Sequence, residues 1–490
     1  MIKPSFEEFK KAAQHANIIP VCGEMVVDMD TPLSLYKKMG EGKYSFLFES
    51  LEGGEKWGRY SFMGFDPFLV AGSKGNTFWV QGPDGKIEKE VTDPIESLKE
   101  LMSSFVPASI EGLPRFYGGA VGYLGYDMVR FMERLPEYLE DSAGFHDSLF
   151  MFPSLLLVFD NIKQSLQIIY CAHKDEKTTL EELYNKAVSS IEEVKKKLKR
   201  GIDYPRPATG TDKTILEPQV DQMRFEEMVK KAKEYIRAGD IIQVVLSQRF
   251  AGRSHLPPFE IYRVLRRINP SPYLYYLRMG DEALIGSSPE ILVRLTEDKV
   301  ELRPIAGTRP RGATYEEDQA LEKELLKDPK ERAEHLMLVD LGRNDVGRVA
   351  EIGSVKVDDL MVIERYSHVM HIVSGVTGRL RQDKDMFDLL RACFPAGTVS
   401  GAPKIRAMEI IEELEHARRG PYAGAVGYFG FSGNMDFAIT IRTLCQKGEK
   451  LYLQAGAGIV ADSDPTKEWE ETLNKGRALM KAIEMAEGGS

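Results

Sequence analysis

Two segments of the sequence carry carboxylates at spacings that place them on one face of a helix. Each segment begins with an Asp-Pro pair, which is typical of the start of a helix. The residues that share a face are Glu331 and Glu334 in the segment that begins at Asp328, and Glu468, Glu471 and Lys475 in the segment that begins at Asp464. Carboxylates on a shared face repel one another unless water or a cation separates them, and oxygen ligands suit Mg²⁺. Taken by itself, each segment is more typical of a solvated face with Glu/Lys pairs.

A glycine-rich loop, GTVSGAPK from Gly397 to Lys404, enters a third helix. A phosphate loop ends in Gly-Lys-Ser/Thr, whereas Pro403 precedes Lys404 here, so the loop does not predict a nucleotide site. Pro403 suits the first turn of a helix. The free N–H groups of the loop fit either an anion site or a plain tight turn.

Two features closer to the C-terminus could hold a carboxylate. The run LYLQAGAGIV, residues 451–460, is a predicted strand with two glycines, which lets either a substrate carboxylate or a neighbouring strand approach the backbone. Arg442 follows the apolar run FAITI. Its guanidinium therefore needs a carboxylate partner, from the protein or from a ligand.

The secondary structure predicted to position these residues differs between the N-terminal and C-terminal parts of the chain. The N-terminal part alternates short apolar runs with Gly, Pro and Asp turns and predicts strands at 44–51, 78–80, 155–159 and 166–170. After Asp221 we predict helices at 225–238 and 259–269 and strands at 241–250, 273–279 and 299–302. Because the helices come in blocks between hairpin-like strands, the predicted fold class is α+β with large antiparallel sheets.

The boundaries between regions follow from composition. A charged helix from about residue 176 ends in a basic run and leads into a Pro/Thr-rich stretch, which is typical of a linker. We therefore divide the chain into an N-terminal region (1–195), a linker (196–220) and a C-terminal region (221–490) that holds the carboxylate and glycine segments above.

Composition excludes several classes of protein. The chain has 490 residues, 43% of them hydrophobic and 29% charged, which excludes a disordered or fibrous protein. Its formal net charge is −10, so nucleic acid is not an expected partner. No apolar run reaches the roughly 18 residues of a membrane span, and we expect a soluble, cytoplasmic protein without a membrane partner. The four cysteines lack a C-x-x-C spacing and predict reduced thiols rather than a zinc site or disulfides.

Five segments together closely resemble the chorismate-utilising enzyme family. They are PIAGTRPRG (304–312), EHLMLVDLGRND (334–345), FPAGTVSGAPK (394–404), PYAGAVGY (421–428) and QAGAGIV (454–460). The resemblance covers roughly residues 220–485, and residues 20–170 resemble the N-terminal region of the family's large subunits. Five long motifs in the same order are far more specific than a single short one.

The resemblance implies a fold and a set of site residues. The implied fold is two large antiparallel β-sheets packed as a sandwich, with helices on the outside. Mg²⁺ is the implied cofactor and would clamp a chorismate carboxylate. Glu334 and Glu471 would be its direct ligands, with Glu331 and Glu468 nearby, able to act directly or through water. The implied substrate-binding groups are Tyr422, Arg442, the amides of Gly456, Ala457 and Gly458, and Lys475, while Gly307 and Thr308 would line the ring pocket.

Two positions distinguish between reactions within the family. Relatives that add water to the ring resemble one another in having a lysine base where this chain has Gln243, and a neutral amide cannot deprotonate water. We therefore expect ammonia as the nucleophile. Relatives that make aminodeoxychorismate for folate synthesis have a lysine nucleophile where this chain has Ala306, which disfavours that alternative. A non-catalytic, ligand-sensing relative is a second alternative, but both expected metal ligands are present.

The expected reaction is that of a carbon–oxygen lyase in the first committed step of tryptophan synthesis. Ammonia adds at C2 of chorismate as the C4 hydroxyl leaves, and loss of pyruvate then gives anthranilate. The resemblance identifies Glu290 as the general acid, which needs a raised pKa, and His371 with the elimination half. By itself, an imidazole among Val, Met and Ile is more often a core histidine.

A partner and an inhibitor are also expected. No cysteine lies in the Gly-x-Cys-x-Gly pattern of a glutaminase nucleophile, so a separate glutaminase subunit would supply ammonia, in a heterotetramer with two of each chain. The run LFES (47–50) and the run NPSPYLY (269–275) resemble the two walls of the family's site for L-tryptophan. We expect Ser50, Pro272, Tyr273 and Leu274 to bind this inhibitor, with Ser50 at the end of a predicted edge strand.

Overall fold

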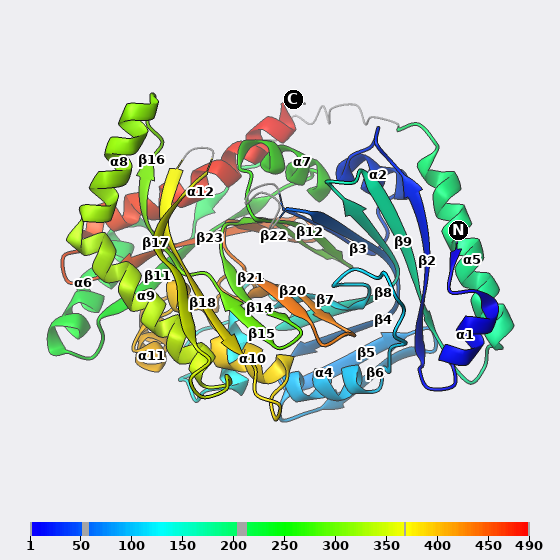
Figure 1. Cartoon of the computed structure of the whole chain (residues 1–490). Coiled ribbons are helices and arrows are strands. Elements are labelled where there is room, and N and C mark those ends of the chain that lie inside the picture. Colours follow the sequence, from blue (N-terminus) through cyan, green and yellow to red (C-terminus); the bar gives the residue numbers. More distant parts are fainter. Residues whose placement is uncertain (1, 51–57, 203–212, 367–368, 489–490) are drawn as a thin grey trace.

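The computed structural model of the protein describes residues 2–50, 58–202, 213–366 and 369–488 (Figure 1). The N-terminal strands are β1 (Ile2–Lys3), β2 (Ile18–Val26), β3 (Tyr44–Glu49), β4 (Tyr60–Lys74), β5 (Thr77–Gly82), β6 (Gly85–Glu90), β7 (Gly119–Leu124), β8 (Ser148–Asp160) and β9 (Ser165–His173). The later strands are β10 (Glu217–Pro218), β11 (Gln243–Arg253), β12 (Tyr273–Met279), β13 (Glu282–Ser288), β14 (Ile291–Thr296), β15 (Lys299–Leu302), β16 (Ile305–Pro310), β17 (Lys356–Arg365), β18 (Val369–Arg379), β19 (Gly401–Ala402), β20 (Ala425–Gly430), β21 (Met435–Ile439), β22 (Thr443–Lys447) and β23 (Lys450–Ile459).

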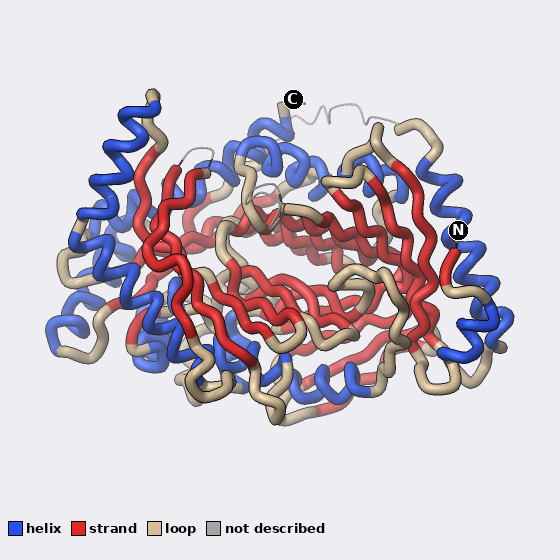
Figure 2. The backbone as a smooth tube through the Cα atoms, in the orientation of Figure 1, coloured by secondary structure: helices blue, strands red, loops and turns tan. Residues whose placement is uncertain are grey.

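The helices lie outside the strands (Figure 2). They are α1 (Phe6–Ala12), α2 (Pro32–Met39), α4 (Pro94–Ser103), α5 (Leu180–Leu198), α6 (Gln222–Ala238), α7 (Pro258–Ile268), α8 (Tyr315–Lys327), α9 (Pro329–Gly347), α10 (Met386–Cys393), α11 (Lys404–Leu414) and α12 (Pro465–Glu487), with short 3₁₀ turns η1 (Tyr126–Phe131) and η2 (Gly397–Val399). The Asp-Pro pairs begin α9 and α12 as predicted. Asp328 caps α9 by accepting hydrogen bonds from two N–H groups, and Asp464 caps α12.

The paired strands form two layers that share β4 and β8. One layer follows β10-β11-β23-β22-β13-β12-β3 and continues through β9, β2 and β1; the other follows β17-β18-β15-β14-β21-β20-β7 and continues through β5 and β6. β4 and β8 pair along their whole length, with a register shift between Pro67 and Leu69 opposite Pro153. Their two halves belong to different layers, since β3 and β9 pair with one end and β5 and β7 with the other. The predicted α+β sandwich of antiparallel sheets is therefore confirmed, with one hydrogen-bonded network folded into both layers.

The main hydrophobic core fills the space between the layers. It joins Phe46 of β3 and Leu284 of β13 to Val293 of β14 and Phe437 of β21. A second cluster covers the outer face of the first layer, where α1, α5, α7 and α12 pack on the strands. Burial on both faces explains why the strands read as apolar runs rather than as alternating patterns.

Three further expectations concern the N-terminal region and the linker. The predicted edge strand that ends near Ser50 was wrong, because β3 pairs with β4 on one side and with β12 on the other. Residue 51 of that strand and residues 203–212 of the predicted linker lie outside the described residues. The domain boundaries stay a prediction.

Two expectations from composition concern the state of the cysteines and the presence of a membrane-spanning segment. All four cysteines are free, and three of them are buried. Within the described ranges, no helix combines the length and the apolar character that a membrane crossing requires.

Candidate active site

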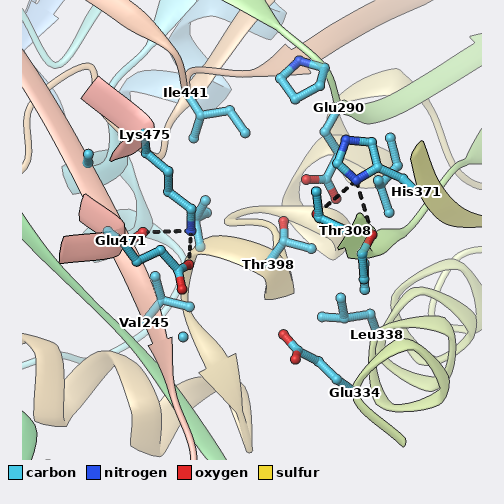
Figure 3. Close-up of a pocket in the computed structure, with 18 of the residues that line it drawn as sticks. Val245, Glu290, Thr308, Glu334, Leu338, His371, Thr398, Ile441, Glu471 and Lys475 are labelled. Carbon is cyan, nitrogen blue, oxygen red and sulfur yellow. Dashed lines mark hydrogen bonds and ion pairs between the residues drawn. The ribbon is translucent and has the colours of Figure 1, made fainter. Parts of the chain in front are cut away.

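A large cavity, here called the chamber, lies where α9 and α12 approach the ends of β11, β16, β18 and β23 (Figure 3). Its volume is about 550 Å³. The structure brings together almost all the residues predicted for catalysis, substrate and metal. Those that line the chamber are Gln243, Glu290, Gly307, Thr308, Glu334, His371, Tyr422, Arg442, Gly456, Gly458, Glu471 and Lys475, together with Glu331 and Glu468.

The two carboxylate helices face each other across the chamber. Burial and the neighbouring Glu331 carboxylate raise the pKa of Glu334, and burial likewise raises the pKa of Glu468. Glu468 Oε2 is buried and has no hydrogen-bond partner in the described part of the chain. A cation between the helices would relieve both costs.

The carboxylates of the chamber suit a Mg²⁺ ion that takes its remaining ligands from substrate and water. Among the described residues, no three acidic, histidine or cysteine side chains lie close enough together to hold a metal ion. Mg²⁺ commonly binds one or two carboxylates, substrate oxygens and water. Glu334 from α9 and Glu471 from α12 offer such a pair, one from each side of the chamber.

One wall of the chamber is built to hold an anion. Burial lowers the pKa of Arg442 and raises the pKa of Tyr422 to about 12, because both charged forms lose hydration. No carboxylate in the described ranges forms an ion pair with Arg442; its Nη1 donates to the carbonyl of Lys475 at 3.3 Å. We expect Arg442 to pair with a carboxylate of the protein or of a ligand. Since no described carboxylate pairs with it, a ligand carboxylate can be this partner.

Lys475 stands beside this wall. Its Nζ lies 2.7 Å from Glu471 Oε1 and donates to the Gly456 carbonyl at 2.9 Å. Because the N–H and C=O of one strand residue point to the same edge, the N–H of Gly456 also faces the chamber, as does that of Gly458 two residues on. Ala457 does not line the chamber; it is fully buried in a hydrophobic cluster on the other face of β23.

Gln243 lies at the start of β11, and the end of its side chain lies against the backbone of Gly458 in β23. Its Nε2 donates to Glu334 Oε1 at 3.2 Å, while its Oε1 is buried without a partner among the described residues. A Cβ at Gly458 would lie 2.6 Å from Gln243 Nε2. A larger residue at this position would therefore displace the end of the Gln243 side chain from its place beside Glu334.

Glu290 is the most strongly perturbed acid of the chamber. It lies in the turn between β13 and β14, and its carbonyl accepts a hydrogen bond from the Ile439 N–H at 3.0 Å. Burial raises the pKa of Glu290 to about 8, against smaller opposing effects of the Thr398 hydroxyl and the Lys475 charge. A carboxyl with this pKa is largely protonated at neutral pH and can act as a general acid.

His371 lies on β18 and lines the chamber, as Glu290 does (Figure 3). Its Nδ1 lies 3.1 Å from the Gly307 carbonyl and 3.0 Å from Thr308 Oγ1. Since a carbonyl only accepts, we assign the proton to Nδ1, which leaves Nε2 as an acceptor. Burial lowers the pKa of His371 and keeps the ring neutral. Gly307 has φ +69°, a conformation that favours glycine and turns its carbonyl to the ring.

Several lining residues were not predicted as site residues. Thr398, Leu338, Lys330 and Gln454 all contribute to the chamber wall. Thr398 belongs to the glycine-rich loop, where η2 carries it to Glu290, but Lys404 at the end of that loop pairs with Asp345 at 2.8 Å. Leu338 lies one helical turn after Glu334, a spacing that could have indicated it.

A second, smaller cavity, here called the aromatic cavity, lies beside β3 and β12. Its volume is about 60 Å³. All four residues predicted for the inhibitor, Ser50, Pro272, Tyr273 and Leu274, line it. The register of the two strands explains why: Leu274 pairs with Glu49 and Tyr275 with Phe48, although these segments are over two hundred residues apart.

The polar groups of the aromatic cavity centre on Asp436. This carboxylate accepts from Arg294 Nε at 2.9 Å, from Tyr273 Oη at 3.0 Å and from Arg115 Nη2 at 3.3 Å. Arg115 Nε is buried without a partner in the described part of the chain. Phe62 and Tyr428 complete an aromatic wall. The cavity therefore offers flat apolar faces and one vacant buried donor, a combination that suits an aromatic ligand with an anionic group.

Comparisons with known proteins point to one family. The sequence model described as chorismate binding enzyme matches residues 60–481. The chain is 51% identical to the "Anthranilate synthase component 1" of Acetivibrio thermocellus, with 99% of each chain covered, and 51% identical to that of Aquifex aeolicus, covering 99% of this chain and 98% of the relative. The crystal structure of anthranilate synthase component I from Streptococcus pneumoniae superposes with a TM-score of 0.76 at 40% identity, over 88% of this chain and 95% of that one.

Proposed function

Because the chain belongs to the family of chorismate binding enzymes, we propose that it is the large subunit of an anthranilate synthase. In this proposal it converts chorismate and ammonia into anthranilate, pyruvate and water. The observation that carries the choice of reaction is Gln243, whose neutral amide lines the chamber and donates to Glu334. Without a lysine base at this position, ammonia, which is itself a nucleophile, is the reactant the chamber suits.

Each step uses groups with a defined position in the chamber. Arg442, Tyr422, Lys475 and the edge of β23 hold the carboxylates of chorismate. Ammonia adds at C2, the ring double bonds shift, and Glu290 protonates the C4 hydroxyl, which leaves as water. The C–H bond at the amine-bearing carbon and the neighbouring C–O bond to the enolpyruvyl group then break, which makes the ring aromatic. The departing enolpyruvate takes up one proton at its methylene carbon and becomes pyruvate. His371 is the residue proposed for this second half, and its unprotonated Nε2 supports that role.

We further propose that turnover requires Mg²⁺, held by Glu334 and Glu471, with Glu331 and Glu468 near enough to act through water. When bound, the ion would supply charge neutralisation at a chorismate carboxylate. The opposed carboxylates, their raised pKa values and the unpartnered Glu468 Oε2 support this role. Magnesium chelation should stop turnover and leave the fold intact.

The source of ammonia is proposed to be a glutaminase subunit, in an assembly of two of each chain. Supporting this, none of the four cysteines lies in a nucleophile elbow, three of them are buried, and burial raises the pKa of each of these three thiols. The purified chain should therefore use ammonium but release no glutamate from glutamine until the partner is added.

L-tryptophan is proposed as a feedback inhibitor that binds the aromatic cavity. The vacant Arg115 Nε and the aromatic walls suit its carboxylate and indole. At about 60 Å³ the cavity holds only about two water volumes, so the walls must separate before an indole enters. Binding would then favour a conformation that misaligns the chamber, and chorismate must weaken tryptophan binding by the same factor.

The test of the main proposal is a product assay on the purified chain with chorismate, ammonium and Mg²⁺. Anthranilate fluorescence and enzymatic detection of pyruvate should rise in equal amounts, and both should require all three additions. Formation of a 4-amino product without pyruvate would instead assign the chain to aminodeoxychorismate synthesis. Unchanged chorismate would contradict any catalytic role.

A further inference from the structure

A third cavity, here called the rear cavity, adjoins the chamber at Glu290. This rear cavity has a volume of about 30 Å³. It shares three wall residues with the chamber, Glu290, Thr398 and Leu338. The general acid therefore borders two separate spaces, one large enough for substrate and one the size of a single water molecule.

The rear cavity has both polar and apolar walls, and its titratable or charged wall residues are Glu290, Asp345, Arg303 and Cys393. Thr398 is a further polar wall residue, and its Oγ1 is buried without a hydrogen-bond partner of good geometry among the described residues. Asp345 is 5% exposed. Leu302 and Leu341 form part of the remaining wall. A water needs both room and two or more polar partners, and this cavity offers both.

Asp345 connects the rear cavity to a cation that the proposed reaction does not otherwise use. Its Oδ2 accepts from Lys404 Nζ at 2.8 Å, and the Lys404 side chain is 14% exposed. Burial raises the pKa of Asp345, and the charge of Lys404 opposes that shift. The line from Glu290 through the cavity to Asp345 and Lys404 thus ends near the surface of the protein.

We propose that the rear cavity holds a water molecule that returns a proton to Glu290 from the Asp345–Lys404 pair after each turnover. This inference rests on the proposed function, in which Glu290 gives its proton to the departing C4 hydroxyl. Asp345 is then a positioning residue that acts through the water and does not touch chorismate.

The proton balance of this route is complete. The Glu290 carboxylate takes a proton from the cavity water as the water takes one from Asp345, and Asp345 takes one from Lys404 Nζ. Solvent reprotonates Lys404, while the amine that adds to the ring releases one proton to solvent. One proton enters and one leaves in each turnover, and no oxidant, reductant or further reactant is needed.

The test is the kinetics of Asp345→Asn, because return of the proton follows the chemistry. In rapid mixing with chorismate, ammonium and Mg²⁺, the first turnover should keep the wild-type rate and form one anthranilate per chain. Later turnovers should slow by roughly tenfold or more, so that a burst appears. A first turnover slowed as much as the later ones would show a structural role and overturn the proposal, as would an unchanged steady state.

Two further variants keep the test decisive. Asp340→Asn removes an exposed carboxylate on the same helix, paired with Arg343, and should show wild-type kinetics without a burst. If Asp345→Asn fails to fold because Lys404 is left unpaired, the double variant Asp345→Asn with Lys404→Gln replaces the buried charges by amides and should show the same burst.

A structural readout separates this inference from the proposed function. A high-resolution crystal structure of the unreacted chain should show one water within hydrogen-bond distance of both Glu290 and Asp345. An empty rear cavity overturns the inference whatever the activity. A wild-type chain that shows this water but leaves chorismate unchanged contradicts the proposed function and, with it, the proton route.

Discussion

The chamber and the aromatic cavity lie in the same sandwich but satisfy their polar groups in opposite ways. In the chamber, Gln243 Oε1 and Glu468 Oε2 have no hydrogen-bond partner among the described residues, and Arg442 forms no ion pair with a described carboxylate. In the aromatic cavity, Asp436 already accepts from three donors, and Arg115 Nε is the vacant group. The chamber is also about nine times larger, at about 550 Å³ against about 60 Å³.

The contrast shows what each cavity has to do. Buried polar groups without partners cost free energy in the folded protein, and a substrate or ion that satisfies them recovers that cost where the reaction takes place. A nearly complete network with aromatic walls instead suits recognition without chemistry, since it holds one shape and has few groups left to react. Substitutions in the two cavities should therefore have different consequences.

The largest effect is expected for Glu471→Ala in the chamber. Loss of one of the two carboxylates proposed to bind Mg²⁺ directly should reduce turnover by roughly a thousandfold or more at any accessible Mg²⁺ concentration. Stability should change by less than about 1 kcal/mol, since the pair with Lys475 is half exposed. Turnover and thermal unfolding measure the two quantities. Glu470→Ala, on the exposed side of the same helix, is the matched control. Full activity of Glu471→Ala would remove the carboxylate from the mechanism.

Glu290→Gln should reduce turnover by roughly 10²- to 10⁴-fold, because an amide cannot protonate the leaving hydroxyl. In the wild type the acid form is the active one. Turnover should therefore be steady at lower pH and fall as the pH rises through about 8, the pKa to which burial raises this carboxyl. A pH–rate profile of kcat without that alkaline limb would argue against Glu290 as the acid.

The same variant should be more stable than the wild type at alkaline pH. The ordinary pKa of 4.5 applies to the unfolded chain, and about 8 to the folded chain. As pH rises between these values, only the unfolded chain ionises, so the group lowers the free energy of unfolding by about 1.4 kcal/mol per pH unit. A glutamine does not ionise, so the free energy of unfolding of the variant does not fall for this reason. Urea unfolding at pH 5 and pH 8.5 should show the two proteins diverging; parallel curves would contradict the raised pKa.

A smaller effect is expected for Gly458→Ala. The new methyl group would lie 2.6 Å from Gln243 Nε2 and displace the amide that donates to Glu334. The Mg²⁺ concentration for half-maximal turnover should rise by roughly 10- to 100-fold, as is common when a partner of a metal ligand is disturbed. Gly347→Ala, where a Cβ meets nothing within 4 Å, should leave this concentration unchanged.

The smallest effect on turnover is expected in the aromatic cavity. Ser50→Phe should keep turnover without tryptophan, since Ser50 does not line the chamber, and should raise the tryptophan concentration for half inhibition by roughly tenfold or more. Inhibition and direct binding should be followed together. Equal sensitivity of variant and wild type would place the inhibitor elsewhere. Complete displacement of tryptophan by saturating chorismate, instead of weakening by a fixed factor, would place it in the chamber.

Local rules predicted the helices of the site but not the distances between them. The Asp-Pro starts and the three- and four-residue spacings define the carboxylate faces of α9 and α12, because helix geometry is local. The pairing of Asp345 with Lys404 depends on tertiary packing across 59 residues, and no spacing indicated it. Ser50 and Pro272 line one cavity because of the register in which β3 pairs with β12. The same pairing makes β3 an inner strand of the sheet instead of an edge strand.

The backbone groups of β23 show a second limit. The sequence indicated the run QAGAGIV as a unit, and the resemblance carried Gly456, Ala457 and Gly458 over together. Strand geometry separates them, since alternate residues face opposite edges. Only the pairing of β23 with β11, which leaves Gly456 to accept from Lys475, decides which amides reach the chamber.

The most direct test of the whole account is the fate of isotopes in one reaction. The purified chain is incubated with chorismate, Mg²⁺ and ¹⁵N-ammonium in H₂¹⁸O, and the ring product is analysed by mass spectrometry. We predict anthranilate with one ¹⁵N on the carbon next to the carboxyl-bearing carbon, no ¹⁸O on the ring, and pyruvate in equal amount. A ring hydroxyl that carries ¹⁸O, or nitrogen at C4 with the enolpyruvyl group retained, would contradict the account.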